Sequence, residues 1–265
     1  MRVGDATPLG GRGPGVIDLH THLLPGVDDG SPTQENSVRV LERLAAEGVR
    51  ELACTPHLAA SRAQEAPVER NAALLLELQA AVGERVRLHR GFEIMLDRPG
   101  MELRLPGLSL GNSRAVLVEF PHGPLPEGHT EELLRLRSGG VVPVVAHPER
   151  YGGMTLDIVR AWREAGAVIQ GDALLLLSTG AKALLARTML EEGVYDILAS
   201  DNHGDRRSLG TVLLWLQEMK GGEQGRTLTE VNPARLLADA ALEPVAPLRP
   251  GKGVWERLRA LVGGR

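Results

Sequence analysis

The sequence has a single cysteine, Cys54, and aromatic residues make up only 3% of its 265 positions. A lone cysteine excludes an internal disulfide and a thiolate metal cluster, and it favours a reducing compartment. The formal net charge is −4, and no run of lysine and arginine is long enough to follow a nucleic-acid backbone or a lipid surface. The first 15 residues lack the apolar centre of a signal peptide or membrane anchor. We therefore predict a cytoplasmic protein that neither binds nucleic acid nor inserts into a membrane.

Apolar residues account for 43% of the sequence and charged residues for 24%, a balance typical of a globular domain. Short runs rich in valine, isoleucine and leucine recur along it. These runs are VIDLH at 16, ELACT at 51, RVRLHRGFE at 85, AVLVEF at 115, VVPVVAH at 141, AVIQGD at 167 and YDILAS at 195. Because they are apolar almost throughout and do not alternate, they predict strands covered on both faces, as in a parallel sheet.

Segments with helical spacing separate these runs. In SPTQENSVRVLERLAAEG, Ser31 suits the N-cap and Gly48 the C-terminal stop. Further helices are predicted near 67–82, 130–138, 155–165, 180–192 and 206–219. Strands and helices that alternate in this number favour an α/β barrel over an open sheet. We assign residues 16–243 to the barrel, 1–15 to a flexible extension and 244–265 to a linker followed by a short helix.

Imidazoles and carboxylates stand at the carboxyl ends of the predicted strands. These side chains are His20, His22, His57, Glu93, Glu119, His147, Asp201 and His203. One such side chain is more often an ordinary hydrogen-bonded group than a ligand. Here, however, six separate segments deliver them, and the carboxyl ends of parallel barrel strands meet at one rim, where such folds keep their active sites. The sequence therefore predicts a site at that rim.

The composition of this set indicates bound cations. Several carboxylates crowded without positive charge drive each other toward the neutral form, and cations remove that penalty. Imidazole mixed with carboxylate suits zinc, manganese or iron better than calcium or magnesium. Asp28 and Asp29 precede Gly30 in a turn, and we expect one of them to join the set and the other to act as a cap. About nine donors, at about four to six per ion, predict two or three metal ions.

A resemblance to a known family rests on six motifs in a fixed order. They are DLHTHLLPGVDDG, CTPH, GFEI, VEF, AHPERY and ASDNH, from about residue 16 to about residue 215. Together they resemble the polymerase-and-histidinol-phosphatase (PHP) superfamily, and within it the bacterial manganese-dependent protein-tyrosine phosphatases of capsule and exopolysaccharide systems. The resemblance implies a distorted (β/α)7 barrel with three metal ions. It implies that His20, His22, Asp201 and Glu93 hold one ion, that Glu93, Glu119 and His147 hold a second, and that Asp29, His57 and His203 hold the third.

Two arginines are candidates for binding a phosphate. Arg150 follows His147 by three residues and is placed to make a planar, bidentate contact with phosphate oxygens. Arg206 is the second candidate, and Arg207 competes for its role because the segment GDRR is shorter than the resemblance leads us to expect. Asp172 ends the sixth strand where the family usually has small polar residues, and the sequence gives it no role. No site role is assigned to His89, His122 and His129.

Three functions fit these features. The first, implied by the resemblance, is a phosphatase that hydrolyses phosphotyrosine in the tail of a bacterial tyrosine autokinase and so regulates capsule or exopolysaccharide export. The second is a small-molecule phosphatase, such as one acting on histidinol phosphate. The third is a non-catalytic PHP module that only binds metal, which the full ligand set argues against. An oligomer is compatible with each of them.

Two other chemistries are disfavoured. Amidohydrolase chemistry needs a bridging lysine after the fourth strand, where this sequence has Glu119. Cysteine-based phosphatase chemistry needs a thiolate of low pKa and an arginine in one phosphate-binding loop. That arginine is expected six positions after the cysteine, where this sequence has Ala60. Cys54 lies inside a predicted strand and is interpreted as a small core residue.

Overall fold

The computed structural model describes residues 15–248 of the protein. Every pairing between its strands is parallel, as the apolar runs predict. The strands are β1 (Val16–Thr21), β2 (Val49–Cys54), β3 (His57–Ala59), β4 (Arg87–Arg90), β5 (Glu93–Met95), β6 (Ala115–Glu119), β7 (Val142–Ala146), β8 (Val168–Asp172) and β9 (Ile197–Ala199). They form two sheets, with the orders β1-β2-β4 and β3-β5-β6-β7-β8-β9.

Two of the barrel strands are interrupted, which explains why the strands form two sheets. The second predicted strand corresponds to β2, and the chain continues after Thr55 and Pro56 as β3, which the sequence pattern did not predict; the third predicted strand breaks at Gly91 and Phe92 into β4 and β5. Pro56 has no N–H to continue a hydrogen-bond ladder. Hydrogen bonds still cross the breaks, since Thr55 N donates to Thr21 O (2.7 Å) and Glu93 N donates to both Pro56 O (3.1 Å) and Thr55 O (3.3 Å). The two sheets are therefore one continuous surface with two kinks.

The barrel closes between β9 and β1. Thr21 and Asn202 form a parallel bridge between the segments. His22 N donates to Asn202 O at 2.7 Å, and Asp201 N donates to His20 O at 3.0 Å. The expectation of a distorted (β/α)7 barrel is thus confirmed, because the broken strands count as one each. Closure also brings the histidines of the first strand beside the aspartate that follows the last.

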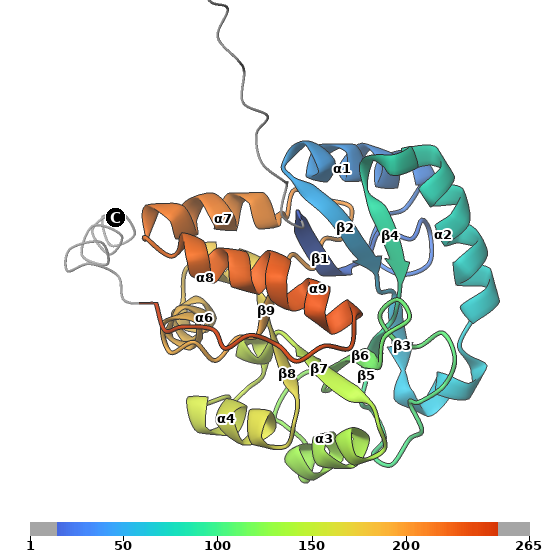
Figure 1. Ribbon diagram of the computed structural model, residues 1–265. Coiled ribbons are helices and arrows are strands. Elements are labelled where there is room, and N and C mark those ends of the chain that lie inside the picture. The colour runs from blue at the N-terminus through green and yellow to red at the C-terminus, as the bar shows by residue number, and fades with distance from the viewer. Residues whose placement is uncertain (1–14, 249–265) are drawn as a thin grey trace, which may run out of the picture.

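Helices cover the barrel, most of them around its outside (Figure 1). They are α1 (Gln34–Ala46), α2 (Val68–Val82), α3 (His129–Ser138), α4 (Leu156–Glu164), α5 (Ala173–Leu177), α6 (Ala181–Glu191), α7 (Leu209–Glu218), α8 (Gly222–Arg226) and α9 (Asn232–Leu237). Thr33, and not the expected Ser31, caps α1, since its hydroxyl accepts from Asn36 N at 3.2 Å. The Ser31 hydroxyl instead donates to the carbonyl of Thr33. Serine and threonine both suit an N-cap, so residue type does not decide whether the helix begins after residue 31 or after residue 33.

The amino-terminal end of the barrel is closed by apolar packing. Side chains from inside the barrel, such as Ile17, Leu117 and Val144, form one cluster with Leu236 of α9. In Figure 1, α9 lies across the front of the strands. A second and larger cluster fills the layer between the strands and the surrounding helices and includes Cys54. Because α9 covers one end, a polar site inside the barrel opens toward the carboxyl ends of the strands.

Parts of two predicted segments lie outside the described residues. The extension assigned to 1–15 and the predicted C-terminal helix fall in positions 1–14 and 249–265, apart from residue 15. Within the described part, Val245 and Leu248 are buried and pack against the larger core cluster.

Candidate metal centre

The donors predicted from the strand ends converge at the carboxyl rim. His20 lies within β1 and His22 directly after it, while Glu93 and Glu119 are the first residue of β5 and the last of β6. The remaining predicted donors lie on β3 or on the loops after β1, β7 and β9; they are His57, Asp29, His147, Asp201 and His203. The breaks in the barrel matter here, because β3 and β5 start at His57 and Glu93 and pair at those two residues.

Glu93 is the centre of the cluster. Its side chain is 1% exposed, and four imidazoles reach its two carboxylate oxygens. Those contacts are His147 Nε2 (2.9 Å), His57 Nδ1 (3.1 Å), His20 Nε2 (3.2 Å) and His22 Nε2 (3.3 Å). Burial raises the pKa of Glu93, but the charges and hydrogen bonds of these imidazoles outweigh burial and hold it well below its usual range. Glu93 is therefore an anion at the bottom of the rim.

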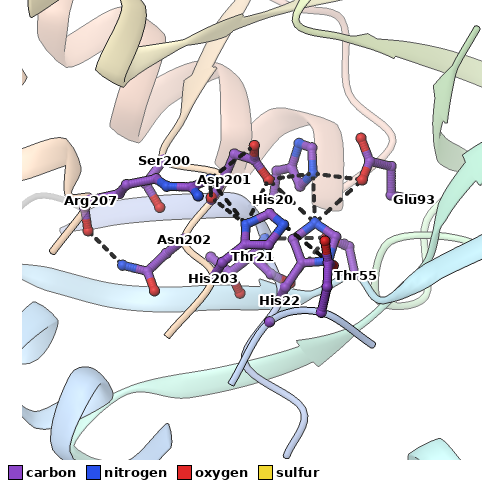
Figure 2. Close-up of polar contacts among 12 residues, drawn as sticks. His20, Thr21, His22, Thr55, Glu93, Ser200, Asp201, Asn202, His203 and Arg207 are labelled. Atoms are coloured by element: carbon purple, nitrogen blue, oxygen red, sulfur yellow. Dashed lines mark hydrogen bonds and ion pairs between the residues drawn. The ribbon is translucent and has the colours of Figure 1, made fainter. Parts of the chain in front are cut away.

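Asp201 links this cluster to two arginines. Its Oδ1 lies 3.2 Å from His20 Nε2 and 3.3 Å from His22 Nε2. Its Oδ2 accepts from Arg150 Nη2 at 2.6 Å and lies 3.3 Å from Arg207 Nη1. Figure 2 shows His20, His22, Glu93 and Asp201 turned toward one another, with Arg207 on the far side of Asp201. The two carboxylate oxygens thus serve different neighbours.

A second set of donors at the rim is more exposed to solvent. Asp29 Oδ1 is 3.4 Å from His57 Nε2 and 3.6 Å from His203 Nε2. The side chains of Asp29 and His57 are 70% and 42% exposed. The His203 ring stacks on the His22 ring with 4.1 Å between centroids. We call Asp29, His57 and His203 the outer donors, and His20, His22, Glu93, His147 and Asp201 the inner donors.

The geometry groups these donors somewhat differently from the expected partition. Four groups have ligand atoms close enough to one another to hold a metal ion: His22 with Asp29, His57 and His203; His20 with His22 and Asp201; His20 with Glu93 and His147; and His57 with Glu93 and Glu119. All nine predicted donors occur in these groups. The expected second group is divided, since His147 lies with His20 and Glu119 lies with His57. Several donors belong to two groups, as in a cluster of neighbouring ions.

The charges of the cluster favour bound cations. Burial alone lowers the pKa of His20, but the negative charges of Glu93 and Asp201 outweigh it and raise that pKa to about 9. Burial is likewise outweighed at His22 by hydrogen bonds to Asp201, Asp28 and Glu93, which raise its pKa to about 11. Burial and the charge of Glu93 raise the pKa of Glu119 to about 7. The field that retains protons on buried imidazoles also attracts metal cations, so the donor set fits transition metals.

Two polar side chains orient the inner imidazoles. Asp28 Oδ2 accepts from His22 Nδ1 at 2.6 Å, and Gln170 Oε1 accepts from His20 Nδ1 at 2.9 Å. In each ring Nε2 is then left to face the carboxylates, as is typical of metal-binding histidines. Gly30 packs so tightly against the backbone of His22 that a Cβ there would lie 2.1 Å from its carbonyl oxygen. The aspartate pair is thus divided: Asp28 orients an imidazole, and Asp29 faces the outer donors.

The three candidate arginines occupy different places. Arg150 contacts Asp201 and also pairs with Asp172, whose Oδ2 accepts from its Nη2 (2.5 Å) and Nε (3.0 Å). Arg207 Nη1 donates to the carbonyl oxygen of Asp201 and lies 3.0 Å from His203 Nδ1. The side chain of Arg206 is exposed, and its carbonyl oxygen accepts from Arg43 instead. Of the two neighbours, Arg207 is the one at the cluster.

Sequence reasoning missed the roles of Gln170 and Asp172. Both lie in β8 at the carboxyl end of a buried apolar run, and a charged or amide residue at that point is the signal that marks them. Two of the histidines that were given no site role have partners outside the cluster. His89 pairs with Glu51 at 2.7 Å, and His129 accepts from the Trp162 indole at 2.8 Å.

Fold and site together define a class: an α/β barrel with imidazoles and carboxylates gathered for several cations at the carboxyl rim. Within that class the chain belongs to the family of capsular polysaccharide synthesis proteins CpsB/CapC, which matches residues 16–238. No helix among residues 15–248 combines the length and apolarity needed to span a bilayer.

Two relatives are similar to this chain over nearly their full length. The tyrosine-protein phosphatase YwqE of Bacillus subtilis is 28% identical over 256 residues, which cover 89% of this chain and 98% of YwqE. The tyrosine-protein phosphatase CpsB of Streptococcus pneumoniae is 26% identical over 243 residues, covering 84% of this chain and 99% of CpsB. A chain from the crystal structures of YwqE and CpsB, described as metal-dependent tyrosine phosphatases, matches with a TM-score of 0.72 at 25% identity, covering 89% of this chain and 99% of its own length.

Proposed function

We propose that the protein is a metal-dependent phosphatase that hydrolyses phosphotyrosine in proteins. The observation that carries this proposal is the buried carboxylate of Glu93 faced by four imidazoles, beside two arginines that contact Asp201. A metal cluster flanked by guanidinium groups suits a phosphate ester, which needs its oxygens neutralised and its nucleophile activated. The similarity to YwqE and CpsB supports phosphotyrosine as the substrate.

We further propose that the nine donors hold two or three divalent ions, with manganese as the first choice and iron or zinc as alternatives. Imidazole and carboxylate ligands suit these metals. When bound, such ions supply Lewis acidity at the phosphate oxygens and lower the pKa of water. Glu93 and His57 each belong to two of the candidate groups, which supports neighbouring ions that share ligands.

The chain's own residues bind and orient the ester. Arg150 and Arg207 meet Asp201 at Oδ2, away from the His20 and His22 rings at Oδ1, and their guanidinium groups can donate to phosphate oxygens in the planar geometry that arginine favours. The exposed outer donors leave the mouth of the site open, which suits a tyrosine side chain on a protein better than a small metabolite. The proposed partner is the tyrosine-rich tail of a bacterial autokinase in the cytoplasm.

Cys54 takes no part in this chemistry. It is fully buried, and burial raises the pKa of its thiol to about 12, so it holds its proton at neutral pH and cannot serve as a nucleophile. We therefore expect Cys54→Ser to retain phosphatase activity while chelation of the metal abolishes it. The reverse pattern would overturn the metal mechanism.

The decisive experiment compares two substrates. The protein is loaded with manganese, and the release of phosphate is measured from a phosphotyrosyl peptide and from histidinol phosphate. The proposal predicts faster turnover of the peptide. Faster turnover of histidinol phosphate would instead show a small-molecule phosphatase, and metal binding with turnover of neither would show a module that only binds metal.

A further inference from the structure

Asp172 is a buried acid whose two oxygens perform separate tasks. Its side chain is 2% exposed. Oδ1 caps α5 by accepting from Leu174 N (2.8 Å) and Leu175 N (3.4 Å), while Oδ2 accepts from Nε and Nη2 of Arg150. Its backbone N–H donates to the buried Glu149 carboxylate at 2.6 Å. Asp172 is therefore held by three hydrogen bonds that do not involve the arginine.

This arrangement determines which edge of Arg150 is free. A guanidinium group has five N–H bonds in a rigid plane. The bonds to Asp172 use Nε and Nη2, and the bond to Asp201 uses Nη2 again. The two N–H bonds of Nη1 take part in none of these contacts. The Arg150 side chain is 26% exposed, so part of it is accessible to solvent.

We propose that Asp172 is a positioning residue for phosphate binding: it holds the Arg150 guanidinium so that the Nη1 edge is presented to an oxyanion at the carboxyl rim. The proposal rests on the proposed function and adds to it the residue that orients the arginine. Without Asp172, a flexible arginine would lose rotamer freedom each time it bound phosphate, and a preorganised one loses less. Misplacement of such a group by about 1 Å can lower catalysis by about 100-fold.

The sign of the effect separates this role from a purely electrostatic one. A negative charge beside Arg150 weakens the attraction of the guanidinium for an anion. If charge alone mattered, removing Asp172 would therefore tighten phosphate binding. If position matters more, removing Asp172 weakens binding. We expect weaker binding, because the aspartate contacts two separate nitrogens and so fixes the plane of the group.

The test is a double-mutant cycle on the manganese-loaded protein. Asp172→Ser keeps a hydroxyl that can cap α5 but is too short to reach Arg150. The affinity for inorganic phosphate is measured by calorimetry for the wild type, Asp172→Ser, Arg150→Ala and the double variant, together with metal content and with KM and kcat on a phosphotyrosyl peptide. We expect Asp172→Ser to weaken phosphate binding about 10-fold in the wild type and not at all in Arg150→Ala, which is the coupling expected of residues in one network. Metal content should not change.

Asp196→Ser is the matched control. Asp196 is also a buried aspartate that accepts from a backbone N–H, of Ile169, and from an arginine, Arg163, but it lies before β9 at the opposite end of the barrel. It should change thermal stability without changing phosphate affinity. If Asp172→Ser does not fold, Asp172→Asn, which keeps the shape and removes the charge, replaces it in the cycle.

Three results would overturn the proposal: equal weakening by Asp172→Ser in both backgrounds, tighter phosphate binding, or no phosphate binding by the wild type. The proposed function is judged on a different readout. Coupled phosphate binding without hydrolysis of the phosphotyrosyl peptide would reject the function and keep the role of Asp172. Hydrolysis with an uncoupled cycle would do the opposite.

Discussion

The inner and outer donors share one rim but differ in how firmly the fold holds them. The inner donors are buried, and Asp28 and Gln170 orient two of their imidazoles. Among the outer donors, Asp29 extends into solvent, and its contacts with His57 and His203 are 3.4 and 3.6 Å long. The inner donors are thus organised before metal binds, whereas ordering the outer donors opposes binding with an entropy loss. We expect the inner positions to bind metal more tightly.

The largest effect should come from Glu93→Gln. The substitution keeps the size of the side chain but removes the charge that four imidazoles face. Loss of a group that merely orients a ligand lowers metal affinity or activity by about 10- to 100-fold, so loss of a shared donor should exceed about 100-fold. Metal content, measured by elemental analysis, should fall by more than one ion per chain. Loss of a single ion would mean that Glu93 belongs to only one position.

A smaller effect is expected from Asp28→Asn. The substitution replaces the negative carboxylate that faces His22 Nδ1 with a neutral amide. The ring therefore loses its fixed orientation and part of its basicity. Manganese affinity should fall by about 10- to 100-fold, as measured by calorimetry. Glu51→Gln, which alters a carboxylate paired with His89 away from the rim, is the control and should leave the affinity unchanged.

Asp29→Asn should have a weaker effect still. The residue is exposed and makes only long contacts with its neighbours, so the two outer imidazoles can hold a cation with water in its place. We expect less than about a 10-fold loss of kcat/KM, below the range for a group that orients a buried ligand. If Asp29→Asn were as damaging as Glu93→Gln, the distinction between inner and outer donors would fail.

The mildest change leaves the sequence intact and alters only the pH. Without metal, His20 and His22 have pKa values of about 9 and about 11, above the value of about 6.5 expected in the unfolded chain. Between the unfolded pKa and the native pKa of each histidine, the native state binds more protons than the unfolded state. The stability from these two groups is fully present below about pH 6.5 and is lost as the pH rises from there through about 9 for His20 and about 11 for His22. Urea unfolding of metal-free protein should thus give a lower free energy at pH 9.5 than at pH 6.5.

Metal should reverse this dependence, because binding requires neutral imidazoles and releases their protons. Manganese affinity should therefore rise from pH 6 to pH 8, and proton release can be measured in buffers of different ionisation enthalpy. A metal-free protein whose stability does not fall above pH 6.5 would show that the inner imidazoles are not protonated by their acidic neighbours.

The location of the site followed from the sequence because topology alone determines it. Parallel strands place their carboxyl ends at one rim, so donors at strand ends must meet whatever the details of packing. The grouping of the donors was less accessible. His147 lies with His20 and Glu119 lies with His57, and the reach of individual side chains is not fixed by the order of the strands.

Hydrophobic pattern also cannot identify partners that are distant in the chain. Asp172 looked unexplained at the end of an apolar run, because its partner Arg150 lies 22 positions earlier and on another strand's loop. Arg206 and Arg207 are equivalent by residue type. Only the turn after Asp201, where the Arg207 guanidinium is held by Asp205, decides which of the two faces the cluster.

Anomalous diffraction from a crystal soaked in manganese tests the central claim most directly. The account predicts at least two manganese peaks at the carboxyl rim, one bonded to Glu93 and His147 and a weaker one bonded to His57 and His203. A crystal with bound manganese but no peak bonded to Glu93 would contradict it.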